Sequence, residues 1–302
     1  MQTAILSSAP KIPTLQQAEL EISDSLSTAL LYMYPTPRPC FTPELLADIK
    51  AFQAYVAARV ATDLAVKGQS EIQYVVLASG DPSTFNLGGD LNLFVDLIQR
   101  RDKDALMEYA VACIDGAYGF SSHLGQPVTS IALVEGNAQG GGFEAVLSCN
   151  VIIAERSALL GFPEVLFNMF PGMGAYSFLS RRVGAGLAER LIYSGDLYEA
   201  ETLYNMGVVD VLAEPGGGRE ALANYVRMGR RRSNAMNLLR HVRSEYNTLP
   251  YSELLEITSK WVDAAMALTS SELGIMQRLV RAQNKRGQQL EVDTRPALRQ
   301  AT

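Results

Sequence analysis

The sequence predicts an α/β fold followed by a helical C-terminal region, and two observations lead to this prediction. Between residue 20 and about residue 214, short apolar runs bounded by turn residues alternate with stretches of helical pattern. Such alternation is typical of a layered α/β architecture, in which helices cover a sheet. Beyond the interruption at Pro215–Gly218, the chain keeps a helical pattern to about residue 285.

These changes of pattern divide the chain into four parts. We expect a flexible tail over residues 1–12, an α/β core over 13–215, a C-terminal helical region over 216–285 and a polar tail over 286–302. The sequence contains no internal repeat and no low-complexity block that would favour a different division.

The core offers strands and helices in alternating order. The candidate strands are brief apolar runs between turn residues, as expected of buried strands: Tyr74–Leu77, Ser130–Val134 and Val151–Ala154. The candidate helices are Pro43–Lys67, Leu91–Phe120 and Phe143–Cys149. In the C-terminal region, apolar side chains recur at helical spacing at Ile257, Trp261, Ala264, Ala265 and Leu268.

Composition and charge argue against several classes of function. The 302 residues are 48% hydrophobic and 19% charged, which is typical of a globular protein with a large apolar core. No apolar run approaches the roughly 20 residues that span a bilayer, and the net charge of −6 gives no support to nucleic-acid binding. Three scattered cysteines and two histidines leave metal sites and Ser-His-Asp triads short of side chains. The N-terminus lacks a secretory pattern and the cysteines are scattered, so we expect a cytoplasmic protein. We also expect that its chemistry needs no metal or redox cofactor.

The stretch SIALVEGNAQGGGFEA (130–145) is the first candidate for chemistry. Gly140, Gly141 and Gly142 lie where a predicted strand gives way to a predicted helix. The first N–H groups of a helix have no internal partner, and glycines let a phosphate or a developing oxyanion approach them. The absence of Gly-Lys-Ser/Thr excludes a P-loop. Glu144 lies one helical turn after Gly141 and faces the same volume. The alternative is a tightly packed turn with Glu144 as a solvated helix residue.

A second glycine turn follows another predicted strand. In SGDPSTFNLGGDLNLF (79–94), Gly88 and Gly89 precede a predicted helix, and Asp90 is a typical residue for the start of that helix. Two such turns can supply two converging main-chain N–H donors, which is what an oxyanion hole for a thioester requires.

A third stretch, GFPEVLFNMFPGMGAYSF (161–178), places Glu164 among apolar neighbours. If this carboxylate is buried, its pKa is raised, and a raised pKa keeps a general acid protonated near neutral pH. The alternative is an exposed loop carboxylate without a catalytic role.

Together these motifs resemble the crotonase (enoyl-CoA hydratase/isomerase) superfamily. The resemblance lies in FNLGGDL, EGNAQGGGFEAVLSCNVIIA and GFPEVLFNMFPGMGAYSFLSRR, and it runs from about Arg38 to Ala282. Within the superfamily the sequence is most similar to the bacterial diffusible-signal-factor (DSF) synthases, which make cis-2-unsaturated fatty acid signals. The resemblance implies a crotonase-like spiral of ββα units.

The resemblance also implies roles for individual residues. The N–H groups of Gly89 and Gly141 match the two donors of the oxyanion hole, and Glu144 and Glu164 match the two catalytic carboxylates. The implied substrate-binding residues are Gly88, Gly140, Met173, Trp261 and Leu279. For the last three the alternative is ordinary core packing. Gln139 stands where the pattern has a leucine, which implies a changed pocket edge.

The activity implied is dehydration of a 3-hydroxyacyl thioester to a 2-enoyl thioester, followed by hydrolysis that releases the fatty acid. One glutamate removes the α-proton and the other protonates the leaving hydroxyl, and the sequence leaves their order open. The substrate is carried by acyl carrier protein or coenzyme A. Two alternatives remain: a plain enoyl-CoA hydratase/isomerase of fatty-acid metabolism, and a non-catalytic acyl-binding regulatory protein.

Partners are expected on the same grounds. The resemblance implies a homo-oligomer, either a trimer or a hexamer, and allows for a regulatory signalling protein. The basic runs Arg181–Arg182 and Arg230–Arg232 offer a contact for phosphates or for an acidic carrier surface. The alternative for both runs is a solvated helix face.

Overall fold

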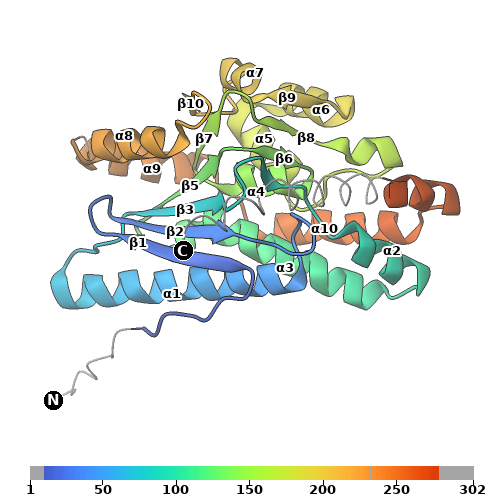
Figure 1. Cartoon of the computed structure of the whole chain (residues 1–302), viewed down its shortest axis with the longest axis horizontal. Helices are drawn as coiled ribbons and strands as arrows, with labels where there is room; N and C mark the ends of the chain where they lie inside the picture. Colours follow the sequence, from blue (N-terminus) through green and yellow to red (C-terminus); the bar gives the residue numbers. More distant parts are fainter. Residues whose placement is uncertain (1–9, 232, 279–302) are drawn as a thin grey trace, which may run out of the picture.

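The computed structural model describes residues 10–231 and 233–278, and its main layer is a six-stranded sheet (Figure 1). The strands stand in the order β1-β2-β3-β5-β7-β10, with β1 antiparallel to β2 and the other neighbours parallel. Their bounds are Ala18–Ser23 (β1), Thr28–Met33 (β2), Tyr74–Ser79 (β3), Thr129–Val134 (β5), Val151–Glu155 (β7) and Val211–Ala213 (β10). The three predicted strands are confirmed as β3, β5 and β7.

A second, four-stranded sheet runs in the order β4-β6-β8-β9. Its strands are Thr84–Asn86 (β4), Asn137–Gln139 (β6), Leu159–Gly161 (β8) and Leu197–Glu199 (β9). The chain passes three times from the large sheet to the small one, through the successive pairs β3/β4, β5/β6 and β7/β8. The chain therefore forms a spiral, and the carboxyl ends of the parallel strands β4, β6 and β8 lie on the same side of the small sheet.

Helices cover both faces of the large sheet, which explains why strands β2, β3, β5 and β7 are buried along their whole length. On one face of the sheet, strand side chains such as Val76 and Ile131 pack on α8 (Gly218–Arg231). On the opposite face, strand side chains such as Leu77 pack in the core formed with α1 (Pro43–Lys67) and α3 (Lys103–Ser121). Figure 1 shows α1 and α3 on one side of this sheet and α8 on the other.

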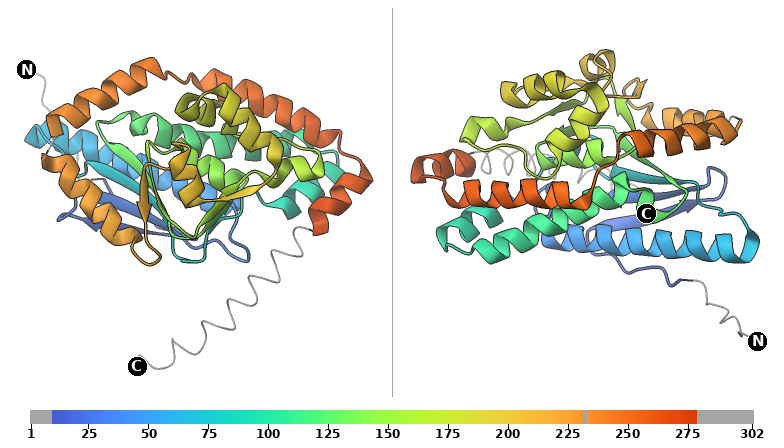
Figure 2. Two further views of the ribbon diagram at one scale, coloured as in Figure 1. Left: turned by 90° about the horizontal axis from the view of Figure 1, so that it is seen from above. Right: turned by 180° about the vertical axis from the view of Figure 1, so that it is seen from behind.

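The C-terminal region is helical, as predicted. It consists of α8, α9 (Ser233–Tyr246), α10 (Tyr251–Met266) and a further helical segment over 270–278. Helix α10 packs along α3, as the view from behind in Figure 2 shows. Other helices of the body are η1 (His123–Gly125), η2 (Pro163–Phe167), α5 (Ala175–Val183), α6 (Ala185–Ser194) and α7 (Ala200–Asn205).

Two helix predictions are corrected. The single helix predicted over Leu91–Phe120 is two helices, α2 (Leu91–Gln99) and α3, because Arg101 adopts φ 59° and Asp102 caps α3 by accepting the N–H of Ala105 at 3.1 Å. Helix α4 (Gly141–Ser148) begins two residues before the predicted start, so Gly141 and Gly142 form its first turn.

Some expectations fall on residues that the structure does not describe. The polar tail (286–302) and Leu279 lie wholly outside the described residues, and the N-terminal tail (1–12) lies mostly outside them. None of the described helices combines the length and the apolar character that crossing a membrane requires.

Candidate active site

The two glycine turns meet at one edge of the small sheet. Gly88–Gly89 follows β4 and Gly140–Gly141 follows β6, and the carboxyl ends of these parallel neighbours lie together. A Cβ built on Gly141 would lie 3.3 Å from Cα of Gly88 and 3.4 Å from the nitrogen of Gly89. Gly88 and Gly140 have φ of 97° and 54°, which side chains disfavour. Glycine is therefore required by the backbone conformation at Gly88 and Gly140, and at Gly141 it keeps the two turns in close contact.

Each turn has one main-chain N–H group that has no partner in the described part of the chain. Among the described residues, no hydrogen bond uses the N–H of Gly89 or of Gly141. Gly141 is the first residue of α4, so its N–H lies at the positive end of that helix. Both glycines line the same cavity. The structure therefore offers two unpaired donors to a group bound there.

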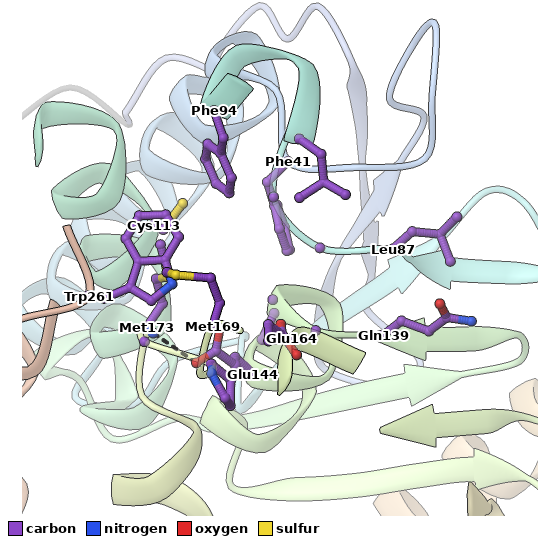
Figure 3. A pocket seen from close by; sticks show the side chains of 18 of the residues that line it. Phe41, Leu87, Phe94, Cys113, Gln139, Glu144, Glu164, Met169, Met173 and Trp261 are labelled. Carbon is purple, nitrogen blue, oxygen red and sulfur yellow. Dashed lines mark hydrogen bonds between the residues drawn. The ribbon is translucent and has the colours of Figure 1, made fainter. Parts of the chain in front are cut away.

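The cavity has a volume of about 350 Å³ and a mostly apolar wall (Figure 3). Of the residues predicted to bind substrate, Gly88, Gly140, Met173 and Trp261 line it. Gln139 lies at its edge, and Figure 3 shows the Gln139 side chain directed away from the two carboxylates. The cavity has room for an acyl chain beside the glycine turns.

Glu144 lies on α4 and is buried, with 2% of its surface exposed. Its Oε1 accepts the N–H groups of Met173 at 2.8 Å and Ala175 at 3.0 Å, which fixes the carboxylate at the cavity. Burial raises the pKa of Glu144 to about 7, and the two accepted hydrogen bonds oppose the rise. The alternative of a solvated helix residue is wrong.

Glu164 lies on η2, which follows β8, the strand paired with β6. Its Oε1 would lie 2.4 Å from a Cβ on Gly140, so the carboxylate rests directly on that glycine. The Oε2 atom is buried and has no hydrogen-bond partner among residues 10–231 and 233–278. Burial first, and the neighbouring Glu144 carboxylate second, raise the pKa of Glu164 to about 8. The alternative of an exposed loop carboxylate is wrong.

The raised pKa of Glu164 predicts a pH-dependent stability. Between pH 4.5 and about 8 the folded state holds a proton that the unfolded state has lost, so the free energy of unfolding falls as the pH rises. A Glu164→Gln variant lacks this effect. We expect it to be more stable than the wild type at pH 8, by about 4 kcal/mol, and nearly equal to it at pH 4.5. Urea unfolding at the two pH values measures this, and an equal difference at both would contradict it.

Part of the cavity wall was missed by the sequence reasoning. Cys113, Gly116 and Ala117 of α3 line the cavity, and the rings of Phe94 and Tyr109 complete this side, with their centroids 5.2 Å apart. The sequence signal that could have revealed this wall is the set of three small residues, Cys113, Gly116 and Ala117, at spacing i, i+3 and i+4 on one helix face. The helical pattern revealed the helix but not which of its faces adjoins a hollow.

The basic runs are corrected in part. Arg181 pairs with Glu253 at 2.8 Å, and Arg182 pairs with Asp210 at 2.7 Å, so this run holds the fold together and does not offer free charges to a carrier. Arg230 donates to the Ser27 hydroxyl at 2.8 Å. Arg232 lies outside the described residues.

Within the described part of the chain, no three His, Cys, Asp or Glu side chains gather in a way that could hold a metal ion.

Comparison with known proteins gives two sequence findings. The profile of the enoyl-CoA hydratase/isomerase family matches residues 51–284. YngF of Bacillus subtilis, which carries the name of an enoyl-CoA hydratase/isomerase, is 33% identical over 150 residues, or 50% of this chain and 55% of YngF. The chain spans about half the length, or less, of the curated relatives it matches.

Solved structures share the fold. DspI of Pseudomonas aeruginosa is 26% identical, with a TM-score of 0.59 over 73% of this chain and 78% of the DspI chain. The enoyl-CoA hydratase of Bacillus halodurans is 20% identical, with a TM-score of 0.71 over 87% of this chain and all of that one. These matches confirm the crotonase-like fold that the sequence predicted.

Proposed function

The chain belongs to the enoyl-CoA hydratase/isomerase family, and we propose that it converts a 3-hydroxyacyl thioester to a 2-enoyl thioester and then hydrolyses that thioester. The product would be a cis-2-unsaturated fatty acid, as for the DSF synthases that the sequence resembles. The 26% identity with DspI supports this synthase assignment, and the TM-score of 0.71 with the enoyl-CoA hydratase of Bacillus halodurans keeps a plain hydratase as the second candidate.

One observation carries the proposal: two unpaired main-chain donors and two buried carboxylates line one apolar cavity. A thioester oxygen bound by the N–H groups of Gly89 and Gly141 accumulates negative charge when the α-proton leaves. One such donor contributes about 10²–10³ in rate. The carboxylates of Glu144 and Glu164 flank the place where the acyl carbons would lie.

The dehydration needs one ionised and one protonated carboxylate. The ionised carboxylate takes the α-proton, the electron pair of that C–H bond forms the double bond, and the C–OH bond breaks. The protonated carboxyl supplies the proton with which the hydroxyl leaves as water. A positioned acid or base of this kind contributes about 10²–10⁴ in rate. The Glu144 carboxylate raises the pKa of Glu164, so we expect the two groups to titrate as a pair that carries one proton near neutral pH.

Thioester hydrolysis uses the same oxyanion site. One carboxylate removes a proton from water, the water oxygen attacks the carbonyl carbon, and the C–S bond breaks to give the acid and the carrier thiol. The negative charge of the tetrahedral intermediate lies on the oxygen that Gly89 and Gly141 would hold.

The proposal also includes the carrier of the acyl group, which is acyl carrier protein or coenzyme A. It further includes a trimeric or hexameric assembly and a regulatory partner protein.

The shared proton predicts a bell-shaped pH dependence of kcat/KM. The pair should carry one proton between pH 7 and 8, gain a second below this range and lose the last above it. We expect the maximum of kcat/KM for dehydration within this range, with about tenfold loss per pH unit well outside it. A rate that rises steadily through pH 9 would show that no protonated carboxyl takes part.

Product analysis tests the proposed activity. The purified protein is incubated with a series of 3-hydroxyacyl-CoA thioesters, and the products are separated by liquid chromatography and mass spectrometry. We expect a 2-enoyl thioester first and then a free unsaturated acid with an equal amount of CoA thiol. A plain hydratase/isomerase gives the enoyl thioester alone, and a binding protein gives neither product.

A further inference from the structure

The turn that carries the Gly89 N–H is held by hydrogen bonds on both sides of that group. The N–H of Leu87 donates to the carbonyl of Pro39 at 2.7 Å, and the carbonyl of Gly88 accepts from Phe41 at 2.8 Å. The N–H of Asp90 donates to the Tyr109 hydroxyl at 3.2 Å. The main-chain groups on either side of the Gly89 N–H are therefore held by hydrogen bonds.

Tyr109 connects the two segments that form this turn. Its side chain comes from α3 and is 6% exposed. The hydroxyl accepts from the N–H of Asp90 and donates to the carbonyl of Phe41 at 2.5 Å. Phe41 and Gly89 form an isolated parallel bridge, so the hydroxyl connects the two segments that this bridge pairs. One oxygen atom therefore fixes the residues on either side of the oxyanion turn.

Asn86 holds the same turn from the other side. Its Oδ1 accepts the N–H of Gly88 at 2.8 Å, and its Nδ2 is buried and has no partner among the residues that the structure describes. The orientation of the amide is set by the Gly88 N–H, because a rotated amide would oppose one donor with another. The Asn86 backbone also touches Gly142, since a Cβ there would lie 2.0 Å from the Asn86 carbonyl oxygen. Asn86 thus ties the first glycine turn to the second.

We propose that Tyr109 is the positioning residue of the oxyanion hole, with Asn86 as its counterpart, and that together they aim the Gly89 N–H into the cavity. The proposal rests on the proposed function, because it assigns the Gly89 N–H to a thioester carbonyl. Neither side chain takes part in the chemistry. Without the Tyr109 hydroxyl, the partly buried Asp90 N–H and the buried Phe41 carbonyl both lose the oxygen that lies between them, and the turn relaxes to bring them together.

The test compares Tyr109→Phe with Tyr118→Phe, a matched change on the same helix. Tyr118 packs on Tyr251 and does not line the cavity. We expect Tyr109→Phe to lower kcat about tenfold to a hundredfold with little change in KM, less than the ~10²–10³ for complete loss of a donor. The Tyr118→Phe control should keep the wild-type kcat. Asn86→Leu, which keeps the shape and removes the acceptor, should act in the direction of Tyr109→Phe.

A spectroscopic readout separates positioning from general loss of structure. Isotope-edited infrared spectra are recorded for a bound acyl-CoA analogue in which CH₂ replaces the thioester sulfur. In the wild type the carbonyl band should move to lower frequency on binding, and Tyr109→Phe and Asn86→Leu should each lose part of this shift.

Two results would overturn these claims, and they differ. A full band shift with wild-type kcat in both variants would overturn the positioning role alone. A wild-type protein that binds the analogue without any band shift would overturn the proposed function itself.

Discussion

Glu144→Gln and Glu164→Gln are each expected to slow dehydration of a 3-hydroxyacyl thioester by about 10²–10⁴ in kcat. Each amide keeps the size of the side chain but can neither take nor give the proton. Both carboxylates line the cavity, and burial raises the pKa of each toward neutral pH. Removing either leaves the pair unable to act as acid and base together, so the double variant should lose little more than a single one.

A matched control is available in Glu135. Burial also raises the pKa of this carboxyl, but Glu135 does not line the cavity. Steady-state kinetics of Glu135→Gln should therefore equal those of the wild type. If Glu144→Gln and Glu164→Gln kept full turnover, neither carboxylate would be catalytic, and a non-catalytic acyl-binding protein would be the better description.

Gly141→Pro is expected to lower kcat about 10²–10³-fold, because it deletes one oxyanion donor. Proline lacks an N–H and is tolerated at the first position of a helix, which is where Gly141 lies in α4. The matched variant Gly141→Ala keeps the N–H and adds a Cβ at 3.3 Å from Cα of Gly88, a contact that needs only a small adjustment. We expect Gly141→Ala to lose much less activity.

Circular dichroism and thermal unfolding of the two variants show whether the helix is retained. Equal kcat values for the proline and alanine variants, with the fold intact in both, would show that the Gly141 N–H contributes nothing to the rate. A proline variant with intact fold and low kcat supports the donor role.

The fold was predicted well where local signals and packing agree. Helix α1 was predicted with its observed bounds, because Thr42 caps its start, Pro43 suits the first turn and Gly68 ends it in the left-handed conformation. The break between α2 and α3 was missed. The helical pattern continues through it, and the cap at Asp102 is a local competitor that the pattern does not reveal.

The candidate site was predicted in its composition but not in its contacts. The two glycine turns were evident because each follows a predicted strand, and Glu164 was evident from its apolar neighbours. The roles of these residues were implied by the resemblance to the crotonase superfamily. The partners of Glu144 lie 29 and 31 residues away along the chain, so its burial could not be inferred from its neighbours in the sequence. Arg181 was misjudged for the same reason, since Glu253 is 72 residues away. Such contacts follow from the topology of the spiral and not from local pattern.

A crystal structure with a bound 3-hydroxyacyl-CoA analogue, in which CH₂ replaces the thioester sulfur, tests the central claim most directly. We predict that the carbonyl oxygen lies about 2.7–3.1 Å from the nitrogen atoms of both Gly89 and Gly141. We also predict that the carboxylates of Glu144 and Glu164 lie beside the second and third acyl carbons. A carbonyl oxygen that contacts neither amide, or an acyl chain bound outside this cavity, would contradict the account.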